Sequence, residues 1–311
     1  MKKGIALSGG GAKSFSQIGV LKVLEKEGFT FDIITGTSMG AIIGTIYCFV
    51  GNAEKTEEIV IKVFSNKEFK KIEKIFSKTE ETNSFKSIWK NIITFSLLLI
   101  DSFKIGLYDS EKIKRKIKSK KIIKSEFYFE NLKKTLGIVA TEYTTGKTII
   151  FNKGEIIPAL IASSAIPGLI TPVEINNCLY VDGGVTSNLP VVANYLLGGE
   201  IIIGIENNSL FEKYKPKNTF DIFVHLEKIK TIYSGLFESL LSDFTINIEL
   251  PDIEWFNFSK VKECIKIGEK YAQQSIKFVE EIFNKTEKSS FKQEIIEKIK
   301  DYFLIRESAN I

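Results

Sequence analysis

The first 50 residues carry two apolar segments, each followed by a turn and then by apolar residues at helical spacing. Residues 4–8 form a short apolar segment that ends in glycines, and QIGVLKVLEKEG then repeats apolar positions with a helical period up to Gly28. FDIITGTS predicts a second buried strand that ends in a turn, and MGAIIGTIYCFVG predicts a helix of small and apolar residues. The pattern therefore predicts a βαβα unit.

The later pattern predicts a helical excursion, more strands and C-terminal helices. Residues 54–134 are rich in Lys, Glu, Ile and Phe at helical spacing, which indicates a helical excursion over one side of the sheet, with a scaffold role as the simplest interpretation. LGIVATEY and GKTIIFNKG predict a strand pair, and LYVDGGV and EIIIGIEN predict further strands. Residues 259–305 predict amphipathic helices. Without an internal repeat or linker, we expect one α/β domain over residues 1–311, with its motifs in residues 4–206.

Composition and net charge limit the classes of binding partner but do not identify one. The chain of 311 residues is 44% hydrophobic, enough for a sizeable core, and its 43 Lys and Arg against 38 Asp and Glu leave a net charge of +5. This mild excess suits an anionic membrane surface but lies far below that of a dedicated nucleic-acid binder. The apolar segment at the N-terminus is too short for a signal peptide. The apolar segment of residues 92–100 is too short to span a membrane.

The three cysteines favour a cytoplasmic protein. Cys48, Cys178 and Cys264 are an odd number and lack the spacing of a metal site, which is typical of reduced thiols. We therefore expect no disulfide framework. We also expect no metal, no cofactor, and membrane contact that is at most peripheral. The oligomeric state stays open.

Ser38 is the first candidate for chemistry. Gly36 and Gly40 surround it in a G-x-S-x-G motif at the junction of a predicted strand and a predicted helix, the context of a nucleophile elbow. Small flanking residues allow the sharp turn that lifts a serine hydroxyl above the sheet. The motif alone also fits a capping serine with glycines for packing.

A glycine loop follows the first predicted strand. Gly9, Gly10 and Gly11 precede Lys13 and the first helix, so their N–H groups can converge on an anion. The phosphate-binding motifs G-x-x-x-x-G-K-[ST] and G-x-G-x-x-G do not match, and Ser14 stands in the last position of the second. Beside a serine elbow, these N–H groups are better suited to an oxyanion.

The chain offers one histidine as a base for Ser38. His225 lies in FDIFVHLEKIK, alternates with apolar residues in a predicted strand and has no catalytic context, so a packing role is the simplest interpretation. An acidic base is then required. YVDGG places Asp182 at the end of a predicted strand, where Gly183 and Gly184 give close access. The residues therefore point to a Ser-Asp dyad.

Four segments together resemble the patatin-like phospholipase family: GIALSGGGAKSFSQIGVLKVLEKEG, DIITGTSMGAIIG, ASSAIPGLITPV and YVDGGVTSNLPV. The resemblance runs through about residues 4–206 and implies a three-layer α/β/α fold with a mostly parallel central sheet. It also implies a Ser-Asp dyad that hydrolyses lipid acyl esters without a metal.

Within this resemblance, Ser38 matches the nucleophile and Asp182 the aspartate of the D-G-[GA] motif, while residues 9–11 match the oxyanion loop. Two positions depart from the family pattern. Lys13 replaces the commoner Arg, and Ser14 replaces the glycine that usually follows it. Three interpretations of Lys13 stay open: an electrostatic contribution, a contact with a lipid phosphate, and a solvated lysine at a helix start.

Other segments are candidates for the surroundings of the site. ASSAIPGLITP predicts a helix over residues 157–166 that Pro167 and Gly168 end, with Ser163 and Ser164 as hydrogen-bonding candidates for which a structural role is favoured. Residues 89–108 are apolar enough to line an acyl channel or touch a bilayer, although core packing is the simpler interpretation. The same holds for residues 291–305 as a membrane-binding helix.

The sequence thus predicts a lipid acyl hydrolase of the phospholipase A or esterase type that acts through an acyl-enzyme. A thioesterase or acyltransferase with the same dyad remains open, as does a catalytically silent lipid-binding or regulatory protein. A serine protease with a histidine triad is disfavoured by the context of His225. Chain length, head group, positional preference, the acceptor, and regulation by a partner or by calcium are not set by these residues.

Overall fold

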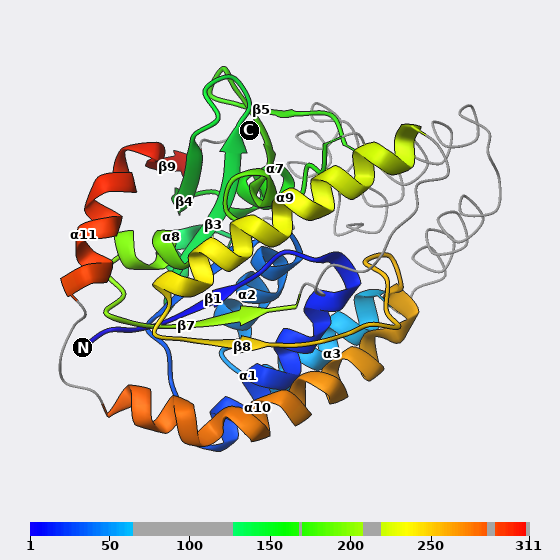
Figure 1. The fold of residues 1–311 in the computed structure, drawn as a ribbon, viewed down its shortest axis with the longest axis vertical. Coiled ribbons are helices and arrows are strands. Elements are labelled where there is room, and N and C mark those ends of the chain that lie inside the picture. Colours follow the sequence, from blue (N-terminus) through cyan, green and yellow to red (C-terminus); the bar gives the residue numbers. More distant parts are fainter. Residues whose placement is uncertain (65–126, 168–169, 208–218, 285–289, 309–311) are drawn as a thin grey trace.

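The computed structural model describes residues 1–64, 127–167, 170–207, 219–284 and 290–308 (Figure 1). Its strands are β1 (Lys3–Leu7), β2 (Ile33–Thr37), β3 (Thr135–Glu142), β4 (Thr148–Gly154), β5 (Val173–Ile175), β6 (Cys178–Asp182), β7 (Ile201–Glu206), β8 (Phe244–Asn247) and β9 (Phe303–Ser308). Its α-helices are α1 (Ser16–Lys26), α2 (Met39–Val50), α3 (Ala53–Phe64), α7 (Ile156–Ser163), α8 (Val191–Leu196), α9 (Thr219–Leu241), α10 (Val261–Phe283) and α11 (Ser290–Ile299). Short 3-10 turns are η1 (Gly11–Phe15), η2 (Phe129–Asn131), η3 (Gly183–Val185), η4 (Phe258–Lys260) and η5 (Lys300–Tyr302).

All strands named above join one sheet, most of whose pairings are parallel. Hydrogen-bonded neighbours run β5-β6-β3-β2-β1-β7-β8, and β4 and β9 continue from β3. The pairs β1–β2, β1–β7, β2–β3, β7–β8 and β4–β9 are parallel, whereas β3–β4, β3–β6 and β5–β6 are antiparallel. The prediction of a mostly parallel central sheet is confirmed.

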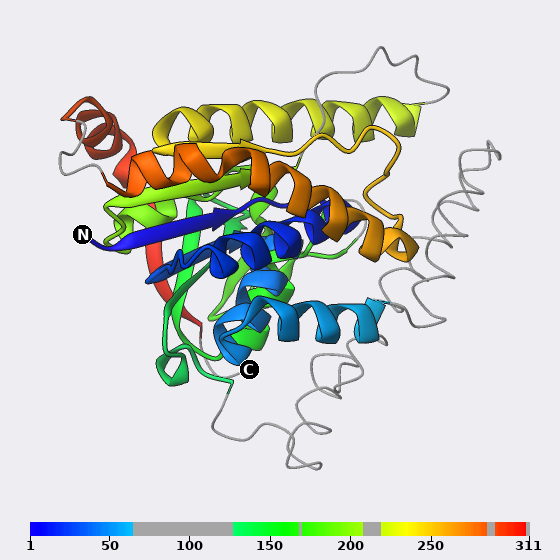
Figure 2. The same cartoon turned by 90° about the horizontal axis from the view of Figure 1, so that it is seen from below.

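Helices cover both faces of this sheet. Side chains that alternate along the strands pack into a large core with α1, α2, α3, α7 and α10 on one face, and into smaller clusters with α8, α9 and α11 on the other. Figures 1 and 2 show α9 along the outside of one face, with α10 on the opposite side of the sheet. The three-layer α/β/α arrangement implied by the family resemblance is therefore present.

Most predicted elements are confirmed, and two predictions were wrong. The segment around His225, predicted as a strand, lies within α9. The last predicted helix stops at Ile299, and the residues up to position 305 continue through η5 into β9, which pairs with β4. In both segments the apolar spacing fitted either structure, and contacts with distant parts of the chain decided the outcome.

The helical excursion can be followed only at its borders. Its beginning is helical in α3, whereas residues 65–126, and with them the apolar segment 89–108, lie outside the described residues. Among the helices of the described residues, none combines the length and apolarity needed to cross a membrane.

Candidate active site

Ser38 occupies a sharp turn between β2 and α2. Its backbone has φ 54° and ψ −121°, and among the described non-glycine residues only Asn176 and Asn177 share a positive φ. A conformation of this kind costs roughly 1–3 kcal/mol and persists where the surroundings hold it. Here the Ser38 N–H donates to Ser163 Oγ at 2.9 Å. The turn thus has the geometry of a nucleophile elbow.

The glycines on either side of Ser38 allow this turn to pack tightly. A Cβ on Gly40 would lie 2.3 Å from the carbonyl oxygen of Leu7, and a Cβ on Gly36 would lie 2.6 Å from Ala41 Cα. Neither approach leaves room for a side chain. The two glycines therefore let the start of α2 rest directly on the end of β1 and on its own preceding strand.

The sheet register brings Asp182 next to this turn. Strand β2 ends with Thr37 opposite Val139 of β3, and β6 ends with Asp182 opposite Ala140, the next residue of β3. Both strands pair along the same edge of β3, because β4 occupies the other edge at these positions. Since β2 runs parallel to β3 and β6 antiparallel, their carboxyl ends meet.

The Asp182 carboxyl group is buried and only partly hydrogen-bonded. Asp182 is 6% exposed, and its Oδ1 accepts the Gly184 N–H at 2.7 Å. Among the described residues, no donor meets normal hydrogen-bond geometry to Oδ2. Burial raises the pKa of Asp182 to about 6, while the Gly184 N–H, the nearby Ser38 hydroxyl and the charge of Lys230 counteract part of the rise. Asp182 is thus more basic than a solvated aspartate.

The glycine loop after β1 has two amides that remain available. Gly10 has φ 151° and Gly11 φ 57°, and a Cβ on Gly11 would lie 2.3 Å from the Trp255 carbonyl oxygen. The Gly9 N–H donates to the Asn188 carbonyl oxygen at 3.1 Å. The described residues supply no acceptor for the N–H groups of Gly10 and Gly11. Gly9 instead provides room, since a Cβ there would lie 2.8 Å from Asn188 Oδ1 and would also contact Ser38 Cβ.

Buried polar side chains hold the loop from behind. Asn207 Nδ2 donates to Ser8 Oγ at 3.0 Å and to Ser14 Oγ at 3.2 Å. Gln17 Nε2 donates to the Ser8 carbonyl oxygen at 2.7 Å. Ser14, a departure from the family pattern, is therefore a member of this network. Asn207 could have been suspected from the sequence, because it follows β7 at the carboxyl end of the sheet.

The segment after Asp182 joins the region of Ser38 and Asp182 to α9. The Asn188 N–H donates to Ser234 Oγ at 3.2 Å, and Ser234 Oγ donates to the Thr186 carbonyl oxygen at 3.2 Å. Ser187 Oγ donates to Glu238 Oε1, and the Val192 N–H donates to Glu238 Oε2 at 2.9 Å. No motif marks these α9 residues.

Gly183 and Gly184 lie between Asp182 and this segment. A Cβ on Gly183 would lie 2.3 Å from the Val139 carbonyl oxygen, and one on Gly184 would lie 3.1 Å from Asp182 Oδ1. Both positions therefore keep the chain close to β3 and to the carboxyl group, as the predicted close access requires.

The structure also places the other residues that the sequence analysis singled out. Lys13 is 7% exposed in η1, so the interpretation as a solvated lysine was wrong, and its charge is felt by the Cys264 thiol of α10. His225 lies on α9. Ser164 Oγ is buried without a hydrogen-bond partner among the described residues, whereas Ser163 supports the Ser38 turn. Within the same described ranges, no group of three or more His, Cys, Asp or Glu could hold a metal ion.

The sequence is similar to those of several known proteins. An uncharacterized NTE family protein of Mycobacterium tuberculosis is 28% identical over 206 residues, which are 66% of this chain and 48% of that protein. The lysophospholipase NTE1 of Candida albicans is 28% identical over 229 residues, 70% of this chain and 14% of that protein. The chain thus spans about half of the mycobacterial relative and a small part of the fungal one.

A solved structure and a family model complete the comparison. The crystal structure of VipD from Legionella pneumophila superposes with a TM-score of 0.47 at 15% identity, covering 88% of this chain and 66% of that one. The model of the family described as patatin-like phospholipase matches residues 5–195, more than half of the chain. The chain belongs to the patatin-like phospholipase family.

Proposed function

We propose that this protein hydrolyses acyl esters of lipids, with Ser38 as nucleophile and Asp182 as its base. The observation that carries the proposal is that the strained Ser38 turn lies next to the buried Asp182 carboxyl group. Among the described residues, no donor meets normal hydrogen-bond geometry to Asp182 Oδ2. A carboxylate with a pKa of about 6 is a better proton acceptor near neutral pH than a solvated aspartate. Membership of the patatin-like phospholipase family supports the same reaction.

Acylation begins when Ser38 Oγ attacks the ester carbonyl carbon and its proton passes to Asp182 Oδ2. The new C–O bond gives a tetrahedral intermediate with negative charge on the former carbonyl oxygen. The ester C–O bond then breaks, and the leaving alkoxide takes the proton from Asp182. An acyl group remains on Ser38.

The N–H groups of Gly10 and Gly11 stabilise the developing oxyanion. Both belong to the glycine loop beside Ser38, and each donor of this kind contributes on the order of 3 kcal/mol to the transition state. Gly9 serves this loop by its small size, because its own N–H is bonded to Asn188. Lys13 adds positive charge behind the loop, and its burial argues against a contact with a lipid phosphate.

Deacylation repeats the proton transfers with water. Asp182 takes a proton from water as the oxygen attacks the acyl carbon, and Ser38 Oγ leaves with that proton when the second intermediate breaks down. The fatty acid is released, and no metal or cofactor takes part. Thiol esters, or an alcohol in place of water, would follow the same steps, so thioesterase and acyltransferase activity remain secondary candidates.

The proposed substrate class is the acyl ester of a lipid. It rests on the family and on the printed name of the Candida relative, a lysophospholipase, of which this chain covers 14%. We further propose that residues 1–311 form a single domain around this site. A silent lipid-binding protein is disfavoured, since Ser38, Asp182 and the glycine loop are all intact.

Ester hydrolysis by matched variants tests the proposal. We expect wild-type protein to release p-nitrophenol from acyl esters and fatty acid from phospholipid vesicles, and Ser38→Ala and Asp182→Asn to lower both rates at least about a thousandfold. His225→Ala serves as the matched control and should retain near-normal rates. Folded wild-type protein without activity on either substrate, or loss of activity in His225→Ala alone, would contradict the proposal.

A further inference from the structure

Helix α9 exposes large apolar side chains along one side. Their exposed fractions range from 45% at Ile222 to 78% at Leu240. We call the following six residues the α9 stripe: Ile222, Leu226, Tyr233, Leu236, Phe237 and Leu240. At 3.6 residues per turn they lie within roughly 60° of one line, about 27 Å long.

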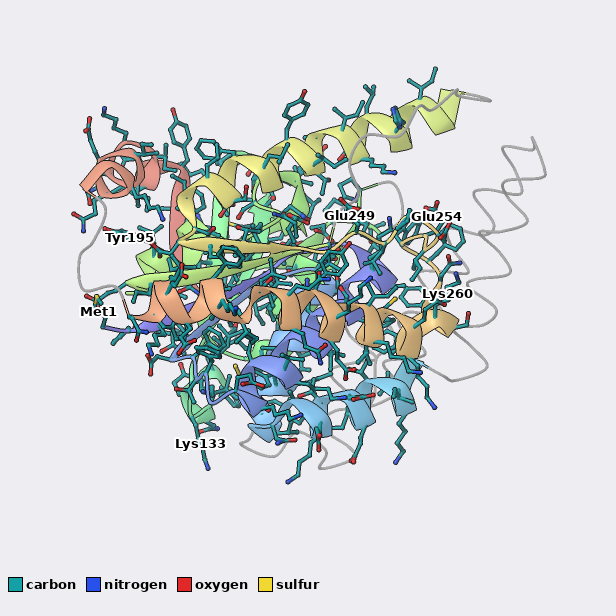
Figure 3. All side chains as sticks on the ribbon, turned by 60° about the horizontal axis from the view of Figure 1, so that its bottom comes forward. Met1, Lys133, Tyr195, Glu249, Glu254 and Lys260 are labelled. Carbon is teal, nitrogen blue, oxygen red and sulfur yellow. The ribbon has the colours of Figure 1, made fainter. Side chains whose placement is uncertain are left out.

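The opposite side of α9 faces the protein and carries polar groups. Gly235 and Glu238 are buried there beside Ile232 and Leu241. A surface helix ordinarily turns its apolar stripe toward the core and its polar residues toward solvent. Figure 3 shows side chains standing out from the outer side of α9, away from the sheet. The helix therefore displays a largely exposed apolar surface on the side that faces away from the sheet.

Two lysines lie beside the stripe at unequal distances. At about 100° per residue, Lys230 falls roughly 70° to one side of the middle of the apolar line and Lys228 roughly 130° to the other side. Lys228 is exposed, and Lys230 is partly exposed and forms an ion pair with Glu227. Long lysine side chains can extend from such positions to the headgroups when the apolar line of a helix lies in a bilayer surface. Anionic headgroups complement these lysines and the net charge of +5.

The stripe is connected to the proposed active site. The inward side of α9 holds residues 186–188 through Ser234 and Glu238, and these residues follow directly on Asp182 and its glycines. The Asn188 carbonyl oxygen also accepts the Gly9 N–H of the glycine loop. The charge of Lys230 is close enough to act on Asp182. A membrane surface bound through the α9 stripe therefore lies near the proposed catalytic groups.

We propose that the α9 stripe docks on the surface of a bilayer that contains anionic lipids and brings the Ser38–Asp182 site to the substrate. This inference rests on the proposed function, because a lipid acyl hydrolase must meet esters that are held in a bilayer. The stripe enters the boundary between headgroups and acyl chains, and the side chains of Lys230 and Lys228 extend to the headgroups.

Vesicle binding separates docking from catalysis. Vesicles of diether phosphatidylglycerol and diether phosphatidylcholine contain no acyl ester bond, so binding to them is measured by cosedimentation without turnover. The docking variant is Leu226→Gln with Leu240→Gln, two exposed positions of the stripe. The control variant is Tyr143→Gln with Ile59→Gln, exposed apolar residues outside α9. Hydrolysis of dissolved p-nitrophenyl butyrate is measured in parallel.

We expect wild-type and control proteins to bind the vesicles equally and the docking variant to bind at least about tenfold more weakly. Its rate on p-nitrophenyl butyrate should match that of the wild type, while its rate on ester phospholipid vesicles falls with binding. If the double substitution impairs folding, Leu236→Gln alone gives the same comparison. Wild-type protein that binds vesicles through the stripe but cleaves neither ester would contradict the proposed function and support docking.

Two results would overturn the docking proposal. One is the absence of vesicle binding by the wild type. The other is equal vesicle binding by wild type and docking variant, in particular when light scattering shows a wild-type dimer that becomes a monomer in the docking variant. In that case the stripe is an interface between two copies of this chain.

Discussion

Helices α9 and α10 are both 23 residues long and lie on opposite faces of the sheet, but they present their apolar residues in opposite directions. Helix α10 turns its apolar residues inward, where Val261, Ile265 and Val279 join the main core. Helix α9 exposes six large apolar side chains and buries Glu238. Two helices of equal length thus have different roles. Helix α10 stabilises the fold, whereas α9 contacts the candidate site.

The difference follows from what each helix packs against. Helix α10 lies directly on α1, since a Cβ on Gly268 would lie 1.8 Å from the Ser16 carbonyl oxygen and one on Gly19 would lie 2.0 Å from the Ile265 carbonyl oxygen. Helix α9 packs against the segment that follows Asp182, and its contacts there are hydrogen bonds from Ser187, Asn188 and Val192. Burial stabilises the first contact, whereas directed bonds position the second.

The largest effect is expected where α10 meets α1. Gly268→Ala places a methyl group against the backbone of Ser16, so the two helices must separate, at a cost of about 3 kcal/mol in the free energy of unfolding. Gln273→Ala, on the exposed side of α10, is the matched control and should change little. Urea unfolding measures both. Equal stability of the two variants would show that the close contact of α1 and α10 is unimportant.

A smaller and pH-dependent effect is expected on the inward side of α9. Burial raises the pKa of Glu238 to about 7, with the charge of Glu206 adding to the rise, while hydrogen bonds from Ser187 and Val192 oppose it. The folded protein therefore keeps this proton to higher pH than the unfolded chain. Its free energy of unfolding should fall between the ordinary pKa of 4.5 and about pH 7, by about 3 kcal/mol at most.

Glu238→Gln should remove most of this fall, because the amide does not ionise. Burial of Asp182 has the same sign, so a decline between its ordinary pKa of 3.8 and about pH 6 should remain. Urea unfolding at about pH 5 and about pH 8 measures the difference, with Glu280→Gln on the exposed side of α10 as control. An undiminished fall in Glu238→Gln would show that this carboxyl group does not destabilise the protein as pH rises.

The sequence predicted those parts of the fold that local pattern decides. The βαβα unit, the elbow at Ser38 and the strand that ends at Asp182 depend on short apolar runs and on glycines at their ends. The start of helix α9 was predicted as a strand because the short apolar alternation around His225 fits either structure. Strand β9 forms because β4, some 150 residues earlier in the chain, offers a free edge.

The candidate site also has one part that the sequence predicts and another that it does not. Ser38, Asp182 and the glycine loop stand in motifs, whereas the supports of the site come from distant segments. Ser163 holds the Ser38 turn, and Asn207 holds the loop through Ser8 and Ser14. Such contacts depend on the register of strands and the packing of helices, which a single sequence does not specify.

The most direct test of the central claim is the mapping of a covalent adduct. An alkyl fluorophosphonate reacts with an activated serine, and the modified peptide is identified by mass spectrometry. We predict one adduct, on Ser38, formed equally in wild type and His225→Ala and at a rate that rises with pH around a midpoint of about 6, as ionisation of Asp182 requires. An adduct on another residue, or labelling of Ser38 that disappears in His225→Ala, would contradict the Ser38–Asp182 dyad.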